Sequence, residues 1–134
     1  MVRVKQRYIL GEIQFNEAGL IDIQTFNQKT LIEAFRVAVQ DAYGDLGLAK
    51  IQSNFIVKYW NPATKVFILK VGRENEDVAV SSLIMITKLY QYECKIRTLH
   101  IAGTLEKVEQ ALKKMTESWI ESQSKKNQLI QQSI

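Results

Sequence analysis

Apolar positions recur at every second residue over positions 4–15, which predicts a β-strand. One parity carries Ile9 and Ile13, so we expect that side to face a core. Gly11 lies on the same side, where we expect it to let a helix approach closely. A turn over 61–64 separates two further strands and makes them a hairpin. The two strands of this hairpin are expected at 51–60 and 66–73, and a fourth strand is expected at 93–102.

Three segments show helical spacing instead. The first begins with a capping box at Thr25, and we expect it to end just before Gly44, its C-terminal cap. Asn75 can cap the second helix, and Thr104 can cap the third. The third helix has the most regular apolar stripe, made of Leu105, Val108, Leu112, Met115 and Trp119.

The resulting order is β-α-β-β-α-β followed by a helix, which predicts an α/β (α+β) sandwich of the ferredoxin-like or RRM-like type. In that fold a four-stranded antiparallel sheet has its first and third strands in the centre. Both parities of the second strand are apolar, so the first two helices should cover one face and the third helix the other. We expect one domain over 1–120 and a polar C-terminal tail over 121–134 that frays or orders only on a partner.

The composition is that of a globular protein, with a net charge of +4 and a pI of about 9.2 in 134 residues. The single cysteine, Cys94, excludes an intrachain disulfide, which indicates an intracellular protein. The opening residues lack the apolar centre and cleavage site of a signal peptide. No apolar run approaches the ~18 residues that a membrane span needs, so we expect no membrane partner.

Charge is distributed unevenly along the chain. Lys50–Arg73 holds five basic residues and no acid, whereas Tyr8–Ala49 holds six acids and two bases. Such a basic segment with aromatic residues indicates a surface for a polyanion, most plausibly RNA. Because the first and fourth strands should be neighbours, we expect Arg7 and Arg97 to lie close together and to hold a phosphate. The candidate RNA-binding residues are Arg3, Lys5, Arg7, Lys58, Arg73, Lys95 and Arg97, with His100 and Thr104 shaping the adjoining turn.

Several other kinds of chemistry are excluded. The third strand has only Phe67 where the RRM pattern needs several aromatic residues, so base stacking on the sheet is not expected and Phe67 is assigned to the core. One histidine and one cysteine at this spacing do not make a zinc site. The chain has no phosphate-binding loop, dinucleotide glycine pattern or nucleophile elbow. We therefore expect no catalytic residue, no metal site and no cofactor in this chain.

Two segments resemble a known family. The opening Met1–Ile13 and the segment Arg97–Thr104 closely resemble the Pop-five-type protein subunit of ribonuclease P and ribonuclease MRP. Val57–Thr64, followed by an apolar strand, is similar to the central hairpin of that family. The resemblance covers roughly 1–115.

This resemblance implies the same α/β sandwich and a non-catalytic role in the particle that removes the 5′ leader from precursor tRNA. The RNA subunit is then the catalyst and binds the magnesium ions. The implied partners are ribonuclease P RNA, the barrel-fold (Rpp-thirty-type) protein subunit, other ribonuclease P/MRP proteins and, indirectly, precursor tRNA. The implied location is the nucleus and nucleolus, or the cytoplasm for an archaeal protein. Protein contacts are expected at the outward residues of the third helix and at Ile56, Tyr59 and Trp60.

Two alternatives use the same fold. A small-molecule sensor module would dimerise through its apolar sheet, although the basic excess does not favour it. A small hydrolase of the acylphosphatase type needs a glycine-rich phosphate loop after the first strand. The sequence there is Asn16–Gly19, with Glu17 where an anion would bind, so this alternative is weak.

Overall fold

The computed structural model of the chain describes residues 5–16, 27–62, 64–89 and 92–132. Short 3₁₀ turns lie at Gln52–Asn54 and Arg73–Asn75. The helices and strands, in chain order, are β1 (Gln6–Phe15), α1 (Gln28–Ile51), β2 (Ile56–Asn61), β3 (Val66–Gly72), α2 (Glu76–Met85), β4 (Lys88–Leu89), β5 (Tyr92–Ala102) and α3 (Leu105–Gln132).

The strands form one antiparallel sheet in the order β2-β3-β1-β5-β4. This confirms the predicted topology, with the first and third predicted strands, β1 and β3, in the centre. The sheet has five strands rather than the four expected, because β4 pairs Lys88 with Glu93 and Leu89 with Tyr92 at its outer edge. Two residues are too few to leave a periodic signal in a sequence.

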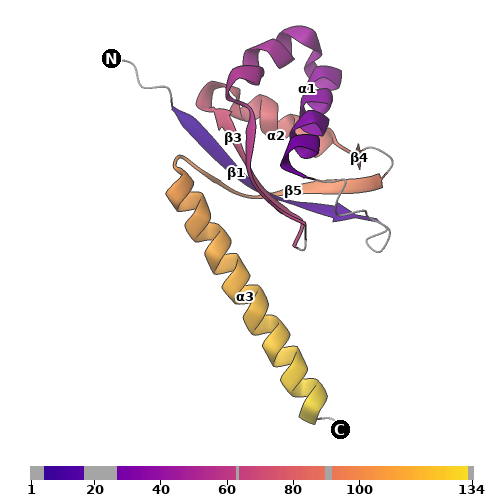
Figure 1. Cartoon of the computed structure of the whole chain (residues 1–134), viewed down its shortest axis with the longest axis vertical. Coiled ribbons are helices and arrows are strands. Elements are labelled where there is room, and N and C mark those ends of the chain that lie inside the picture. The colour runs from indigo at the N-terminus through magenta and orange to yellow at the C-terminus, as the bar shows by residue number, and fades with distance from the viewer. Residues whose placement is uncertain (1–4, 17–26, 63, 90–91, 133–134) are drawn as a thin grey trace.

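One face of the sheet is covered by α1 and α2, which form a layer over it (Figure 1). Ile9 and Ile13 of β1 face this layer and are essentially inaccessible to solvent, as their parity predicts. Phe35 of α1 and Phe67 of β3 pack with their ring centroids 5.1 Å apart. Phe67 is fully buried, so its assignment to the core is confirmed.

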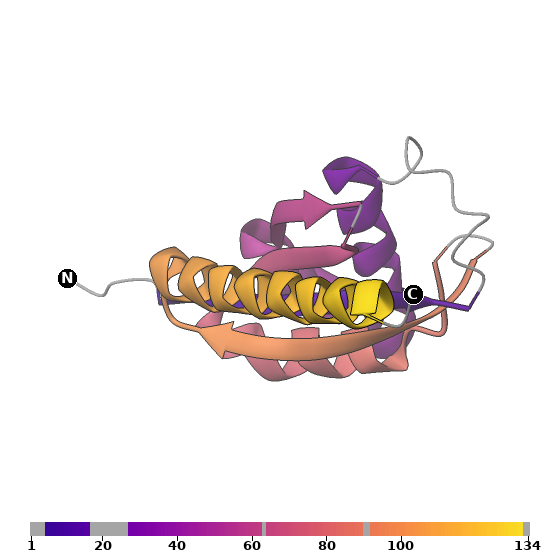
Figure 2. The ribbon, with the colours of Figure 1, turned by 90° about the horizontal axis from the view of Figure 1, so that it is seen from below.

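The opposite face of the sheet is covered by α3, which lies across β1 and β5 (Figures 1 and 2). Thr104 caps α3, as predicted, because its Oγ1 accepts a hydrogen bond from the Lys107 N–H at 3.3 Å. Val108 is fully buried, and Leu105, Leu112 and Met115 pack partly buried around it. The sheet contributes Leu10, Val66, Ile68 and Ala102 to this second, smaller core.

The first helix differs from expectation at both ends. Thr25 lies outside the described residues, and the observed N-cap is Asn27, which forms a reciprocal capping box with Thr30. Gly44 interrupts the helix in a left-handed conformation (φ 76°), but the helix resumes and continues to Ile51. The strand predicted from position 51 therefore starts only at Ile56. Leu48, Ile51 and Phe55 recur at spacings of three and four, which is helical spacing, and all three contribute to the core.

The second helix also ends earlier than its apolar stripe predicts. It stops at Met85, so Ile86 is buried from an extended segment, and Tyr90 lies outside the described residues. Asn75 precedes the helix but makes no capping hydrogen bond; its Nδ2 donates to the Lys50 carbonyl at 3.2 Å. The asparagine thus ties the start of α2 to the end of α1.

The third helix is much longer than predicted. The polar segment from Glu121, expected to fray, continues α3 as far as Gln132. Met115 is the last residue of the stripe that packs on the sheet, whereas Trp119 is 58% exposed. The remaining length amounts to about 25 Å of helix, which projects from the body of the molecule in Figure 1. No helix in the described part of the chain is both long and apolar enough to cross a membrane.

Gly11 accommodates an aromatic ring rather than the helix that we expected. A Cβ atom at this position would lie 2.8 Å from Cε1 of Phe67 and still nearer to Cζ. We expect Gly11→Ala to lower the free energy of unfolding by about 1–3 kcal/mol, because a buried ring or a strand must move. Urea denaturation followed by circular dichroism measures this.

Gly72→Ala is the matched control for that substitution. The nearest atom to a Cβ at position 72 is Asn54 Nδ2 at 3.6 Å, and the backbone at Gly72 is extended. It should change the free energy of unfolding by less than about 1 kcal/mol. Equal destabilisation by both substitutions would contradict the packing described for Gly11.

Candidate nucleic-acid interface

Three of the predicted basic residues gather at one end of the sheet. The β1–β3 register pairs Gln6 with Gly72, and the Arg73 N–H donates to the Lys5 carbonyl at 3.0 Å. Arg7 follows two residues after Lys5 on the same parity of the strand. Lys5 and Arg73 are exposed and Arg7 is half-buried. We call Lys5, Arg7 and Arg73 the strand-end cluster.

The Arg7 side chain lies against the turn that leads into α3. Its Nη1 donates to the Gln6 carbonyl at 3.3 Å, and a Cβ at Gly103 would lie 3.1 Å from the same nitrogen. The guanidinium therefore stands beside the chain segment just before Thr104, at the N-terminus of α3. Helix N-termini carry a partial positive charge, so Arg7 and this terminus both favour an anion at this turn.

The expected closeness of Arg7 and Arg97 is wrong. The β1–β5 register pairs Arg97 with Glu12, five residues along β1 from Arg7. That is about 17 Å at the rise of a strand, and the two positions on β1 have opposite parity, so they serve opposite faces. The sequence predicted the neighbouring strands correctly but not their register.

Arg97 has an acidic partner instead. Its Nη2 lies 3.2 Å from Glu12 Oε2, and the Arg97 side chain is 62% exposed. An exposed pair of this kind adds little stability, but it offsets much of the arginine's charge toward a distant phosphate. Lys95 is also exposed on β5, where the register places it opposite Gln14.

The other predicted residues are spread more widely. Lys58 is exposed on β2, the edge strand three positions from β5, which is about 14 Å across the sheet. His100 is exposed on β5, and its register partner is Leu10. Arg3 lies outside the described residues. The predicted rim thus consists of the strand-end cluster, the Lys95–Arg97 pair and an isolated Lys58.

The three predicted protein-contact residues do not share a face. Ile56 is 42% exposed on the α3 side of β2. Tyr59 packs partly against the smaller core, and its hydroxyl accepts a hydrogen bond from Asn61 Nδ2 at 3.2 Å. Trp60 is on the other side and packs against the larger core. A register shift between Val57 and Tyr59 brings Ile56 and Tyr59 to the same side of the sheet although their parity differs.

Sequence reasoning missed the exposed apolar residues of the helical layer. Val37, Tyr43, Leu46, Ile84 and Met85 are each more than 40% exposed. Val37 has a detectable signal, because Ala34, Ala38 and Ala42 recur beside it at helical spacing. This second apolar stripe on α1 was obscured by the stronger stripe of Leu31, Phe35 and Val39.

Cys94 is a buried structural residue. It is 6% exposed, and its backbone N–H donates to the Thr87 carbonyl at 3.0 Å. Burial raises the pKa of the Cys94 thiol to about 11, against an opposing effect of a backbone hydrogen bond from Leu89. Among the residues that the structure describes, no three His, Cys, Asp or Glu side chains are grouped to hold a metal ion.

The raised pKa predicts that the Cys94 thiol reacts slowly with thiol reagents. At pH 8 the thiolate fraction of Cys94 should be about a hundredfold below that of an ordinary cysteine. Reaction of the native chain with a disulfide reagent should be correspondingly slow, and it should accelerate after addition of urea. The stabilisation from the neutral thiol should be lost as the pH rises from about 9 to 11, because the unfolded chain then loses its proton first. Equal reaction rates in native and unfolded chain would contradict this.

Comparison with known proteins identifies related sequences over most of the chain. The sequence model of the Rpp14/Pop5 family matches residues 7–113. The ribonuclease P/MRP protein subunit POP5 of Schizosaccharomyces pombe is 35% identical over 118 residues, which cover 83% of this chain and 85% of that protein. The POP5 subunit of Danio rerio is 33% identical over 111 residues, which cover 78% of this chain and 64% of that protein.

A solved structure has a similar fold. A chain in the cryo-EM structure of yeast ribonuclease MRP superposes with a TM-score of 0.56 and 15% sequence identity. The match covers 91% of the present chain and 96% of the other chain. At this identity the likeness concerns the fold, and it agrees with the sandwich of sheet and helices described above.

Proposed function

Since the chain belongs to the Rpp14/Pop5 family, we propose that it is a non-catalytic protein subunit of ribonuclease P or ribonuclease MRP. It binds and stabilises the catalytic RNA, and in ribonuclease P it thereby supports removal of the 5′ leader from precursor tRNA. The RNA subunit carries the reaction with its own magnesium ions, and precursor tRNA is met only indirectly. The single observation that carries this proposal is the family match over residues 7–113.

The distribution of charge supports RNA as the direct partner. The strand-end cluster places Arg7 beside the N-terminus of α3, with Lys5 and Arg73 next to it at the ends of β1 and β3. Phosphates are bound by such groups chiefly through release of counterions. Arg7 lies in β1, and Lys5 and Arg73 directly adjoin β1 and β3, two inner strands of a sheet packed on both faces, so the cluster is held by a rigid scaffold.

Protein partners complete the proposal. The exposed part of α3 carries Trp119 and Ile120, which are 58% and 54% exposed, and Ile56 is exposed on the same side of the sheet. Large exposed apolar residues of this kind mark protein contacts. We propose that other ribonuclease P/MRP proteins, among them the barrel-fold subunit, contact these residues in the nucleus and nucleolus.

The alternative of a small-molecule sensor loses its main support. That function needs a free apolar sheet face for dimerisation. In this chain the second face is covered by α3, and Leu10 and Ile68 beneath it are at most 1% exposed. A dimer through this face would first have to displace α3.

The proposed function is tested by purifying the affinity-tagged chain from its own cells. We expect ribonuclease P RNA, or ribonuclease MRP RNA, to be enriched at least tenfold over a tagged unrelated basic protein of similar size. Depletion of the chain should lead to accumulation of precursor tRNA with its 5′ leader. Recovery of neither RNA, with normal tRNA maturation after depletion, would refute the assignment.

A further inference from the structure

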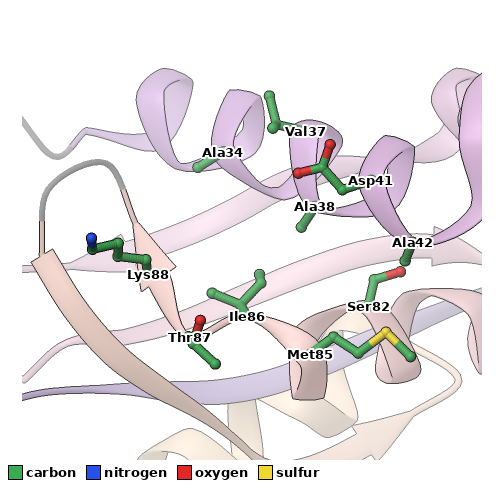
Figure 3. A pocket seen from close by; sticks show the side chains of 10 residues that line it. All are labelled: Ala34, Val37, Ala38, Asp41, Ala42, Ser82, Met85, Ile86, Thr87 and Lys88. Carbon is green, nitrogen blue, oxygen red and sulfur yellow. The ribbon is translucent and has the colours of Figure 1, made fainter.

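A groove runs between the two helices of the helical layer, on the face away from α3. One wall is the outer side of α1, and the other is formed by the end of α2 and the segment that leads into β4 (Figure 3). Val37 and Asp41 stand on the α1 wall, and Met85 and Lys88 stand on the other. We call this the α1–α2 groove.

The groove exists because α1 presents small side chains to it. Ala34, Ala38 and Ala42 follow one another at one-turn intervals along this wall. Alanine side chains are too short to fill the space between two helices, and the core has already been completed by Leu31, Phe35 and Val39 on another side of α1. The space is therefore not needed for packing the chain itself.

Large apolar side chains stand open to solvent at this groove. Val37 is 55% exposed and Met85 is 63% exposed, and Ile84 next to Met85 is 68% exposed. Of the eight large apolar residues that are exposed in the described part of the chain, five belong to α1 and α2. Exposed apolar residues that cluster beside a groove mark a contact with another macromolecule.

The charges beside the groove decide which macromolecule fits. Glu33 and Asp41 stand one turn before and one turn after Val37 on α1, and both are exposed. Within the described ranges the one ion pair is Arg97–Glu12, so these two carboxylates have no ionic partner there. Two carboxylates around an apolar residue attract a lysine or arginine side chain to the α1 wall, and Lys88 on the opposite wall is the one basic residue in the lining.

We propose that the α1–α2 groove docks a protein partner, which inserts an apolar side chain beside Val37 and places a lysine or arginine between Glu33 and Asp41. This inference rests on the proposed function, since the partner is then a protein of the same particle. RNA and this protein partner would then occupy separate sites: RNA the strand-end cluster, and the partner the α1–α2 groove. A second copy of the chain is disfavoured as the partner. Symmetrical docking would bring Glu33 and Asp41 of one copy near the same two carboxylates of the other, and like charges repel.

Site-specific photo-cross-linking in the native particle tests this proposal. The photoreactive residue p-benzoylphenylalanine replaces Val37 in the tagged full-length chain, which is expressed in its own cells. After irradiation and denaturing purification, mass spectrometry identifies the molecule joined to position 37. The same residue at Ile120, which has nearly the same exposure on α3, is the matched control position.

We expect a cross-link from position 37 to a protein that co-purifies with the particle, at a peptide with a lysine or arginine next to an apolar residue. Asp41→Lys should reduce that cross-link at least tenfold, whereas Asp41→Asn should reduce it less than threefold. The cross-link from position 120 should be unaffected by either substitution. Thermal melting of each purified variant checks that the fold is intact.

A cross-link from position 37 to RNA or to a second copy of the chain would overturn the proposal. So would a protein cross-link that Asp41→Lys leaves unchanged, or no cross-link at position 37 when position 120 gives one. The RNA recovered with the wild-type chain is measured separately, so failure of the proposed function is distinguished from failure of the groove. The cross-link at position 37 therefore tests the docking proposal whether or not that RNA is recovered.

Discussion

Replacement of all three residues of the strand-end cluster by alanine is expected to weaken RNA binding about a hundredfold at 0.15 M salt. Lys5, Arg7 and Arg73 stand within two residues of one another across β1 and β3, so one stretch of phosphates can meet them together. Each lost phosphate contact lowers the slope of log affinity against log salt by about 0.7–0.9. The slope of the triple variant should therefore be flatter by about 2–3.

Filter binding with the co-purified RNA at 50–300 mM salt measures both quantities. The matched control is Lys29→Ala combined with Lys88→Ala and Lys114→Ala, which removes the same charge from outside the cluster. Its slope should change by less than about 1. Equal losses in the two triple variants would show that only net charge matters and would contradict a phosphate site at the cluster.

Arg97→Ala gives a further contrast. The sequence treats Arg7 and Arg97 as equivalent phosphate ligands, but the structure places Arg97 against Glu12 and far from the cluster. We expect Arg97→Ala to weaken binding less than about twofold, whereas Arg7→Ala alone should weaken it about fivefold at 0.15 M salt. The single variants thus separate a base that is free for phosphate from one already paired.

Local patterns in the sequence predicted the helices and strands, whereas the positions of the candidate RNA-binding residues relative to one another depend on contacts between distant segments. The alternation over β1 identified correctly which of its side chains are buried, because successive side chains of a strand always point to opposite faces of the sheet. The register between β1 and β5 depends on contacts between residues far apart in the chain, 85 positions for Glu12 and Arg97, and on an irregularity at Leu10–Gly11. The pairing of Arg97 with Glu12 therefore left no sign in either segment alone.

The helices show the same division. Gly44 was correctly expected to leave the helical conformation, because only glycine adopts a positive φ without strain. The resumption of α1 to Ile51 depends on burial of Ile51 and Phe55 beneath the helical layer, which is a tertiary effect. The length of α3 was missed because its polar second half has no apolar stripe, although such residues are good helix formers.

Phe67→Ala is expected to lower the free energy of unfolding by about 3–5 kcal/mol. The ring is fully buried, lies against Phe35 at 5.1 Å and occupies the space that Gly11 leaves open on β1. Neither the sheet backbone nor Phe35 can easily fill the resulting cavity, so little of the loss should be recovered. Urea denaturation measures the change. Phe15→Ala is the comparison. Phe15 is only half-buried at the far end of β1, so its replacement should lower the free energy of unfolding by less.

Combining Phe67→Ala with Gly11→Ala tests the cause of this loss. Alone, Gly11→Ala is destabilising because its methyl group meets the Phe67 ring. With the ring removed, the same methyl group enters an empty cavity, and alanine is also favoured over glycine in a strand. The second substitution should then be neutral or stabilising, so the double-mutant cycle should give a coupling energy of about 1–3 kcal/mol. Simple additivity of the two substitutions would show that the ring and the glycine do not share this space.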